Sequence, residues 1–145
     1  MSSTTAKPKE LFLSHASMDH AFASWLATEL RAAGVPTWFS VTHLKGGQQW
    51  QDAIGRALCR CDWFAVVLSP AAVKSMWVER ELHYALREPR YRNRIIPVLL
   101  RPCRHERLSW ALGSFQFVDF TGGKASGFSS LLRVWRMGAR SKDRP

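Results

Sequence analysis

A tryptophan and a glutamate four residues apart are the side chains of this sequence whose types and spacing suit chemistry. Trp77 and Glu81 lie within Ser75–Leu86, and residues four apart on a helix share one face. An aromatic ring beside a carboxylate, at the start of a helix that follows a buried strand, could bind a ligand and polarise it. A structural tryptophan with a solvated glutamate is the other interpretation that this stretch allows on its own.

The same stretch predicts how the pair is held. Val78, Leu82 and Ala85 recur at helical spacing, so the helix should bury one apolar stripe against a sheet. A second carboxylate, Glu79, competes with Glu81 for a chemical role. It stands two residues earlier, about 200° away around the helix, and therefore lies on a different face.

Serine residues mark the ends of three predicted strands. The loops that follow these strands start at Ser14, Ser40 and Ser69, and they are the loops richest in Ser, His, Asp, Lys, Gly and Trp. In a parallel sheet, ligands bind outside the carboxyl ends of the strands, where the strand order reverses. We therefore expect a binding site at this edge of the sheet.

Strands and helices alternate along the chain. This alternation predicts one parallel sheet that is covered by helices on both faces. The strands are expected at about residues 10–14, 35–40, 63–68, 94–100 and 115–120, and the helices at about residues 19–33, 49–60, 75–86, 105–112 and 128–135.

Single residues refine these boundaries. Asp19 is placed to cap the first helix, and Gly34 is placed to end it. Pro97 has no amide proton to donate, which argues against a fully paired position inside the fourth strand. Ser69 and Pro70 should break the third strand ahead of the helix that carries Glu81.

Length and composition indicate the class of protein. The chain has 145 residues with 46% hydrophobic content, which fits one compact domain. Its longest apolar runs are of strand length and its first residues lack a secretory core, so we expect no membrane span and a cytoplasmic address. Cys59, Cys61 and Cys103 have the spacing of neither a zinc motif nor a disulfide scaffold and are expected to be reduced thiols. No metal site is predicted.

The formal net charge of +10 predicts a surface that attracts phosphate groups or acidic partners. A solubility face with a basic tail is the simpler interpretation. No helix-turn-helix, zinc finger or aromatic RNA-binding motif accompanies the charge, which disfavours nucleic-acid binding. Ser14, His15 and Asp19 suggest a hydrolase triad, but such triads are assembled from distant segments, and ligand binding by the backbone at a strand end explains this cluster better.

Several stretches, taken in order, resemble the boxes of the TIR (Toll/interleukin-1 receptor) domain family. The last of them carries the family's Trp-x-x-x-Glu element as Trp77 and Glu81. The resemblance covers roughly residues 10–135, and its boxes are Leu11–Asp19, Gly34–Ser40 continuing through Leu44–Trp50, Asp62–Pro70 followed by Ser75–Leu82, and Ile96–Val98.

The resemblance implies the fold and the domain limits. We expect a flavodoxin-like three-layer α/β sandwich, with a five-stranded parallel sheet of order 2-1-3-4-5 and helices on both faces. The TIR domain should span residues 10–137, between a flexible leader at 1–9 and a basic disordered tail at 138–145. Leu44–Gly47 departs from the Arg-Asp-x-x-Pro-Gly run of Toll receptors, which argues against an animal-adaptor role more than against a catalytic one. Ser40 stands where many relatives carry an acidic residue, a variation that resembles bacterial members, and we expect a bacterial-type, single-domain member.

Enzymatic members of the family cleave the nicotinamide–ribose bond of NAD, and the resemblance implies that Glu81 is the catalytic residue and Glu79 a solvated one. NAD is then the substrate, and no cofactor is needed. Aromatic rings should stack on its flat heterocycles, while backbone amides after Ser14 and the Lys45–Gly47 turn receive the pyrophosphate. The residues expected at the substrate are Phe12, Ser14, His15, Asp19, Trp38, Ser40, Lys45, Gly46, Gly47, Trp50 and Trp77.

Three functions stay open on the sequence. The first is an NAD glycohydrolase that yields ADP-ribose or a cyclic ADP-ribose isomer, in bacterial immune or cell-death signalling or in virulence. The second is a non-catalytic adaptor, and the third is a phosphate- or nucleic-acid-binding module. The resemblance also implies homotypic TIR–TIR assembly, filamentous in some forms, and partners such as other TIR domains or an effector that senses the product. Activity should then rise with self-assembly.

Overall fold

The computed structural model describes residues 6–40 and 48–137, and a parallel sheet of five strands runs through their centre. The strand order is β2-β1-β3-β4-β5, which confirms the predicted topology. Because the order reverses at β1 and β3, the switch point lies between them. The strands are β1 (Leu11–Ser14), β2 (Thr37–Trp38), β3 (Trp63–Leu68), β4 (Ile95–Leu99) and β5 (Val118–Asp119).

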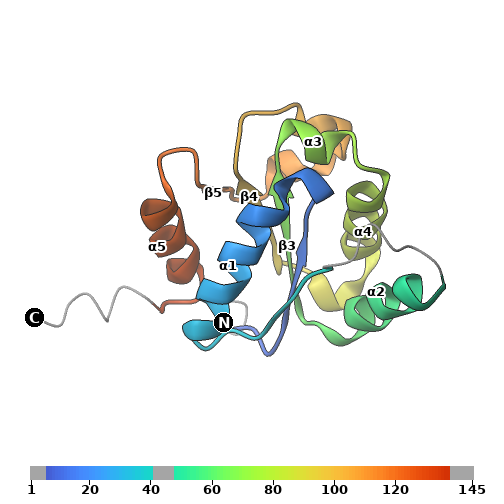
Figure 1. Ribbon diagram of the computed structural model, residues 1–145, viewed down its shortest axis with the longest axis horizontal. Coiled ribbons are helices and arrows are strands. Elements are labelled where there is room, and N and C mark those ends of the chain that lie inside the picture. The colour runs from blue at the N-terminus through green and yellow to red at the C-terminus, as the bar shows by residue number, and fades with distance from the viewer. Residues whose placement is uncertain (1–5, 41–47, 138–145) are drawn as a thin grey trace, which may run out of the picture.

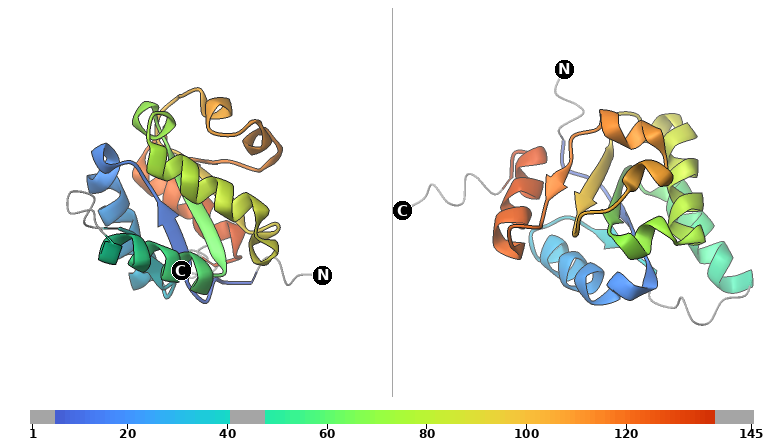
Figure 2. Two further views of the ribbon diagram at one scale, coloured as in Figure 1. Left: turned by 90° about the vertical axis from the view of Figure 1, so that its right-hand side faces the viewer. Right: turned by 90° about the horizontal axis from the view of Figure 1, so that it is seen from above.

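Helices cover both faces of this sheet (Figures 1 and 2). The longer ones were predicted, whereas α3 was expected only as a break after β3. The α-helices are α1 (His20–Ala32), α2 (Gln48–Arg60), α3 (Pro70–Val73), α4 (Met76–Arg87) and α5 (Lys124–Val134), and the 3-10 helices are η2 (Ser17–Asp19), η3 (Pro89–Tyr91), η4 (His105–Arg107) and η5 (Trp110–Ser114).

Two hydrophobic cores flank the sheet, and alternate residues of each strand enter different cores. Leu11 and Leu13 of β1 pack with α1 and α5, whereas Phe12 packs with α2, α3 and α4. All residues of β3 are buried, as expected for a strand that is covered on both faces. The fold is thus the expected three-layer α/β sandwich.

The two edge strands are shorter than predicted. β2 pairs with β1 only at Thr37 and Trp38, and β5 pairs with β4 only at Val118 and Asp119. The neighbouring apolar residues, such as Val35, are buried through their side chains alone. An apolar run therefore predicted burial correctly but overestimated strand length.

Pro97 lies inside the sheet at a position that needs no amide proton. It stands in register with Val66 of β3. Arg94 accepts a hydrogen bond from Phe64 of β3 through its carbonyl, so by alternation the nitrogen of Pro97 faces the other way, toward β5. Because β5 pairs with β4 only from Val98 onward, the missing donor has no strand opposite it, and Pro97 is tolerated.

The predicted cap at Asp19 is wrong, whereas the predicted end of the first helix is confirmed. Asp19 belongs to η2, and its φ of −102° and ψ of 18° differ from the extended conformation of a capping residue, so its side chain caps nothing. At the other end of α1, Gly34 takes a φ of +93°, a left-handed conformation that glycine adopts without strain. Serines cap the later helices instead, Ser69 through Ala72 N–H and Ser75 through Val78 N–H.

Part of the expected leader packs on the domain. Pro8 is buried, and the amides of Lys9 and Glu10 each donate a hydrogen bond of 3.0 Å to the carboxylate of Asp62. The first five residues and the predicted tail at 138–145 lie outside the described residues.

Candidate active site at the carboxyl edge of the sheet

Glu81 reaches the carboxyl end of β1 from helix α4. The predicted stripe of α4 is confirmed, because Val78, Leu82 and Ala85 are all buried, and Glu81 is buried with them at 7% exposure. The hydroxyl of Ser14, the last residue of β1, donates a hydrogen bond of 2.7 Å to Oε1 of Glu81. A carboxylate from a helix is thus fixed at the strand end that adjoins the topological switch point.

Burial gives Glu81 an unusual titration. Loss of solvent raises the pKa of the Glu81 carboxyl to about 7, while the hydrogen bond from Ser14 acts in the opposite direction. Both protonation states are therefore populated near neutral pH, which is a common property of functional carboxyl groups. Glu79 is exposed on the same helix, in agreement with its predicted solvated position.

Three serines at this edge each hold a side chain from another segment. Besides the bond from Ser14 to Glu81, Ser69 donates to the carboxylate of Asp19. Ser40 accepts a hydrogen bond of 2.8 Å from the indole nitrogen of Trp50. These three serines are buried, as are Glu81 and Asp19. The polar edge that the sequence predicted is therefore a set of buried side chains that hydrogen-bond to one another.

Trp77 packs against Trp50 in an edge-to-face contact with ring centroids 4.5 Å apart. The guanidinium of Arg80 lies over its ring, 5.3 Å from the centroid. Both tryptophans were expected at the substrate, and their contact joins α2, which carries Trp50, to α4, which carries Trp77. Trp77 is half-buried, so only part of its ring is open to a ligand.

Phe12 does not have the open ring face that stacking on a ligand requires. It is 1% exposed and lies between Trp38, at 5.0 Å between centroids, and Phe64, at 5.5 Å. The suggestion that Phe12 itself stacks on the substrate is therefore not supported by its burial. Trp38 is half-buried and is the ring of this pair that a ligand can reach.

The hydrogen bonds of Ser14 and Asp19 argue against a serine triad. A hydroxyl has one proton, and that of Ser14 is donated to Glu81 rather than to His15. The carboxylate of Asp19 accepts from Ser69 and pairs with Arg101 at 3.5 Å. His15 is buried, and its Nε2 lies 3.4 Å from Nδ1 of His20.

Sequence reasoning missed the link between Asp19, Ser69 and Arg101. Asp19 and Ser69 are 50 residues apart in the chain, so no local pattern connects them. The signal that was available is the position of Ser69 at the end of a buried strand. Three further residues predicted at the substrate, Lys45, Gly46 and Gly47, lie outside the described residues.

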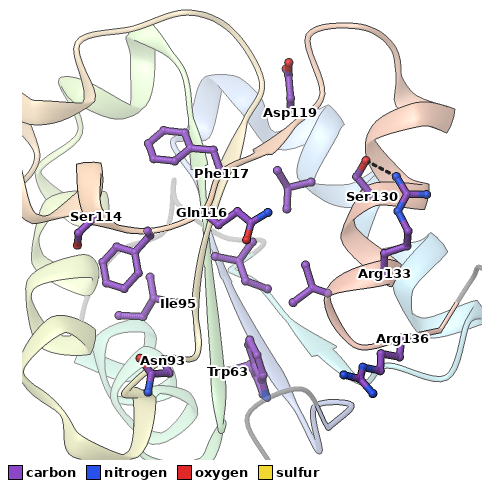
Figure 3. Close-up of a pocket in the computed structure, with 14 residues that line it drawn as sticks. Trp63, Asn93, Ile95, Ser114, Gln116, Phe117, Asp119, Ser130, Arg133 and Arg136 are labelled. Carbon is purple, nitrogen blue, oxygen red and sulfur yellow. Dashed lines mark hydrogen bonds between the residues drawn. The ribbon is translucent and has the colours of Figure 1, made fainter. Parts of the chain in front are cut away.

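The crevice beside Glu81 is narrow. It has no room for a water molecule, and its walls are Phe12, Leu13, His15, Trp38, Ser40 and Glu81. A much larger cavity of about 740 Å³ lies at the opposite end of the sheet. Figure 3 shows this cavity with Trp63 at the start of β3, Phe117 ahead of β5, and Arg133 on α5, which donates a hydrogen bond to Ser130.

Over residues 6–40 and 48–137, no three His, Cys, Asp or Glu side chains gather closely enough to hold a metal ion. The same part of the chain contains no helix with the length and apolar character needed to cross a membrane.

Comparison with known families agrees with this geometry. A family model described as TIR domain matches residues 11–132. The chain belongs to the TIR domain family. The matched range includes all five strands, the helix of Glu81 and most of α5.

Two curated relatives of this TIR domain are bacterial proteins. One is the NAD(+) hydrolase PdTIR of Paracoccus denitrificans, which is 34% identical over 110 residues, or 74% of this chain and 37% of the relative. The other is the 2' cyclic ADP-D-ribose synthase BtTIR of Bacteroides thetaiotaomicron, which is 31% identical over 107 residues, or 72% of this chain and 37% of the relative. The TIR domain thus corresponds to little more than a third of the length of each relative.

Solved TIR structures share the fold at lower identity. The TIR domain of the Toll-related receptor TRR-2 from Hydra magnipapillata has a TM-score of 0.68 at 22% identity, covering 87% of this chain and 97% of that domain. The TIR domains of the activated Roq1 resistosome have a TM-score of 0.54 at 19% identity, covering 87% of this chain and 82% of theirs.

Proposed function

We propose that this TIR domain cleaves the nicotinamide–ribose bond of NAD, with Glu81 as the catalytic residue. The observation that carries the proposal is the buried carboxylate of Glu81, held by Ser14 at the carboxyl edge of the sheet. The names of the two bacterial relatives, an NAD(+) hydrolase and a 2' cyclic ADP-D-ribose synthase, support the same substrate.

A single carboxylate suits this reaction. Nicotinamide leaves as a neutral base from a positively charged ring and takes the electron pair of the broken C–N bond, so it needs no general acid. Ordinary glycosidases need a pair of carboxyl groups because their leaving oxygen must be protonated. Glu81, once ionised, stabilises the oxocarbenium-like charge that develops at the anomeric carbon.

The hydrogen bond from Ser14 uses Oε1 of Glu81, and this leaves Oε2 to accept from a ribose hydroxyl. The cationic nicotinamide ring of bound NAD favours the ionised carboxylate and lowers its pKa from about 7. Substrate binding therefore charges the group that the reaction needs. Attack by water then yields ADP-ribose and a proton, and attack by a nucleophile of the same molecule yields a cyclic isomer.

The test is to incubate concentrated protein with NAD and to follow nicotinamide by chromatography. We expect Glu81→Ala to abolish its release, and the matched variant Glu79→Ala, which removes an exposed carboxylate from the same helix, to release it at a rate close to that of the wild type. Retained release in Glu81→Ala would refute the assignment. The co-product peak separates hydrolysis from cyclisation.

We also propose that the active form is an assembly of several copies. In a single chain the crevice beside Glu81 has no room for a water molecule, so NAD enters only if the walls rearrange. Contact with a neighbouring copy is a source of that rearrangement. We expect nicotinamide release to rise more steeply than linearly with protein concentration. Strict proportionality over the range in which light scattering detects assembly would contradict this.

A non-catalytic adaptor is the alternative function, and it rests on the same self-association. The absence of nicotinamide release from assembled wild-type protein would favour it. Cytoplasmic action, further TIR partners and a role in immune or cell-death signalling stay predictions from the sequence.

A further inference from the structure

A second cleft opens at the carboxyl edge of the sheet, on the other side of β3 from Glu81. It lies between α3 and the segment that follows β4, and Figure 1 shows α3 at the top of the view with this segment beside it. Its volume is about 590 Å³, within the usual range for small-molecule sites. The residues that line it are Pro70, Val73, Lys74, Cys103, Arg104 and Arg107.

The charges of this cleft have one sign. Lys74, Arg104 and Arg107 contribute three cations, and no carboxylate lines the cleft; Glu106 is exposed on η4 outside the lining. Within the described residues, the side chains of these three cations form neither an ion pair nor a hydrogen bond. The nearby Arg101, by contrast, is paired with Asp19.

Apolar side chains line the cleft together with these cations. Pro70 and Val73 come from the two ends of α3, and the half-buried thiol of Cys103 lines the same cleft. Guanidinium groups bind phosphate oxygens in pairs, and an ammonium group adds a point charge. Cations and apolar side chains in one cleft therefore suit a ligand that has a phosphate group and a flat, weakly polar body.

We propose that this cleft binds a nucleoside phosphate, with the phosphate held by Lys74, Arg104 and Arg107 and the nucleoside against Pro70 and Val73. Two sources share this chemistry. One is a separate nucleotide, and the other is the adenylate end of an NAD molecule. The second source rests on the proposed function, whereas the first does not.

The primary test is binding of ADP by calorimetry at low salt. We expect the double variant Arg104→Ala/Arg107→Ala to bind ADP about tenfold more weakly or worse. The matched control is Arg87→Ala/Arg92→Ala, which removes the same charge from two exposed arginines outside the cleft, at the end of α4 and directly after η3. It should bind ADP like the wild type. Equal losses in both variants, or no binding by the wild type, would overturn the proposal. Inorganic phosphate that binds as tightly as ADP would overturn the nucleoside part.

Cys103 provides a local readout that needs no catalysis. Burial raises the pKa of its thiol, and Glu106 and Asp19 raise it further, so alkylation by N-ethylmaleimide is best followed at about pH 8 or above. We expect ADP to slow alkylation of Cys103 and to leave that of exposed Cys59 unchanged. Equal rates at Cys103 with and without ADP would contradict binding in this cleft.

The two sources are separated with NAD and the Glu81→Gln variant, in which NAD is expected to stay intact. If NAD protects Cys103 and the double arginine variant raises KM for NAD at unchanged kcat, the cleft holds the adenylate end of the substrate. If ADP protects Cys103 while KM is unchanged, the ligand is a separate nucleotide. Because ADP binding is measured independently, its failure is distinguishable from a failure of NAD cleavage.

Discussion

The two ends of the sheet use polar side chains in opposite ways. At the amino end, Asp62 accepts from the amides of Lys9 and Glu10, and Arg90 donates to the carbonyls of Leu58 and Cys61. These bonds satisfy backbone groups at the end of α2 and just ahead of β1, and they link segments that are distant in the chain.

At the carboxyl edge, buried side chains bond to one another instead. Ser14 holds Glu81, Ser69 holds Asp19, and Trp50 holds Ser40. Ser69 also caps α3 by accepting from Ala72 N–H, but the bonds within the three pairs involve no backbone group. A buried carboxyl with a pKa near 7 costs stability when it ionises. This difference is what we expect if the amino end stabilises the fold and the carboxyl edge carries the proposed reaction.

The largest expected effect that sharpens this comparison is a gain in the free energy of unfolding of the Glu81→Gln variant at high pH. The folded-state pKa of about 7 exceeds the ordinary value of 4.5, so between these values the folded protein binds more protons than the unfolded chain, and the free energy of unfolding falls as pH rises. Glutamine does not titrate. We expect the variant to resemble the wild type near pH 4.5 and to be more stable by about 3 kcal/mol near pH 8.

Urea unfolding across this pH range measures the difference. Glu79→Gln, at an exposed carboxylate of the same helix, should show no such divergence. A Glu81→Gln variant that is less stable than the wild type near pH 8 would mean that the carboxylate is structural and that the contrast between the two ends fails.

A break at the amino end should have the opposite signature. Arg90→Ala removes the donors to Cys61 and Leu58 carbonyls, and Tyr91, which donates to Leu58 at 2.6 Å, replaces only one of them. We expect a loss of about 2 kcal/mol in the free energy of unfolding, with nicotinamide release per folded molecule unchanged. If the Arg90→Ala variant releases less nicotinamide per folded molecule than the wild type at temperatures far below its melting point, the two ends are coupled.

The smallest effect concerns the bond between Ser14 and Glu81. Ser14→Ala removes the hydroxyl that stabilises the ionised carboxylate, so the pKa of Glu81 should rise further, by about 1 unit. The acid limb of the pH profile of nicotinamide release should move to higher pH by the same amount, with activity recovered at alkaline pH. A uniform loss at all pH values would instead indicate that Ser14 contacts the substrate.

Residue patterns predicted most of the fold, and their failures have physical causes. β3 was placed correctly because a strand that is buried on both faces consists of consecutive apolar residues, and such a run is visible in the sequence. The edge strands were overestimated because Phe115 and Phe117 pack on the core through side chains without joining the ladder. Asp19 was assigned to a cap because capping is read locally, whereas its partner Ser69 is distant in the chain.

Only part of the candidate site could be predicted from the sequence. The spacing of Trp77 and Glu81, with the family resemblance, identified the candidate carboxylate. The spacing did not indicate that Trp77 packs on Trp50 or that Glu81 bonds to Ser14, because these contacts join segments 27 and 67 residues apart. Pairings of that kind depend on how the elements stack.

The most direct test of the contrast is nicotinamide release by Glu81→Gln, which keeps the shape of the side chain and its ability to accept from Ser14. Measured beside Glu79→Gln in samples shown to be folded by thermal melting, we expect release to fall by about a thousandfold while the melting temperature near pH 8 rises. Release close to that of the wild type, from a folded Glu81→Gln protein, would contradict the role of this carboxylate in the reaction.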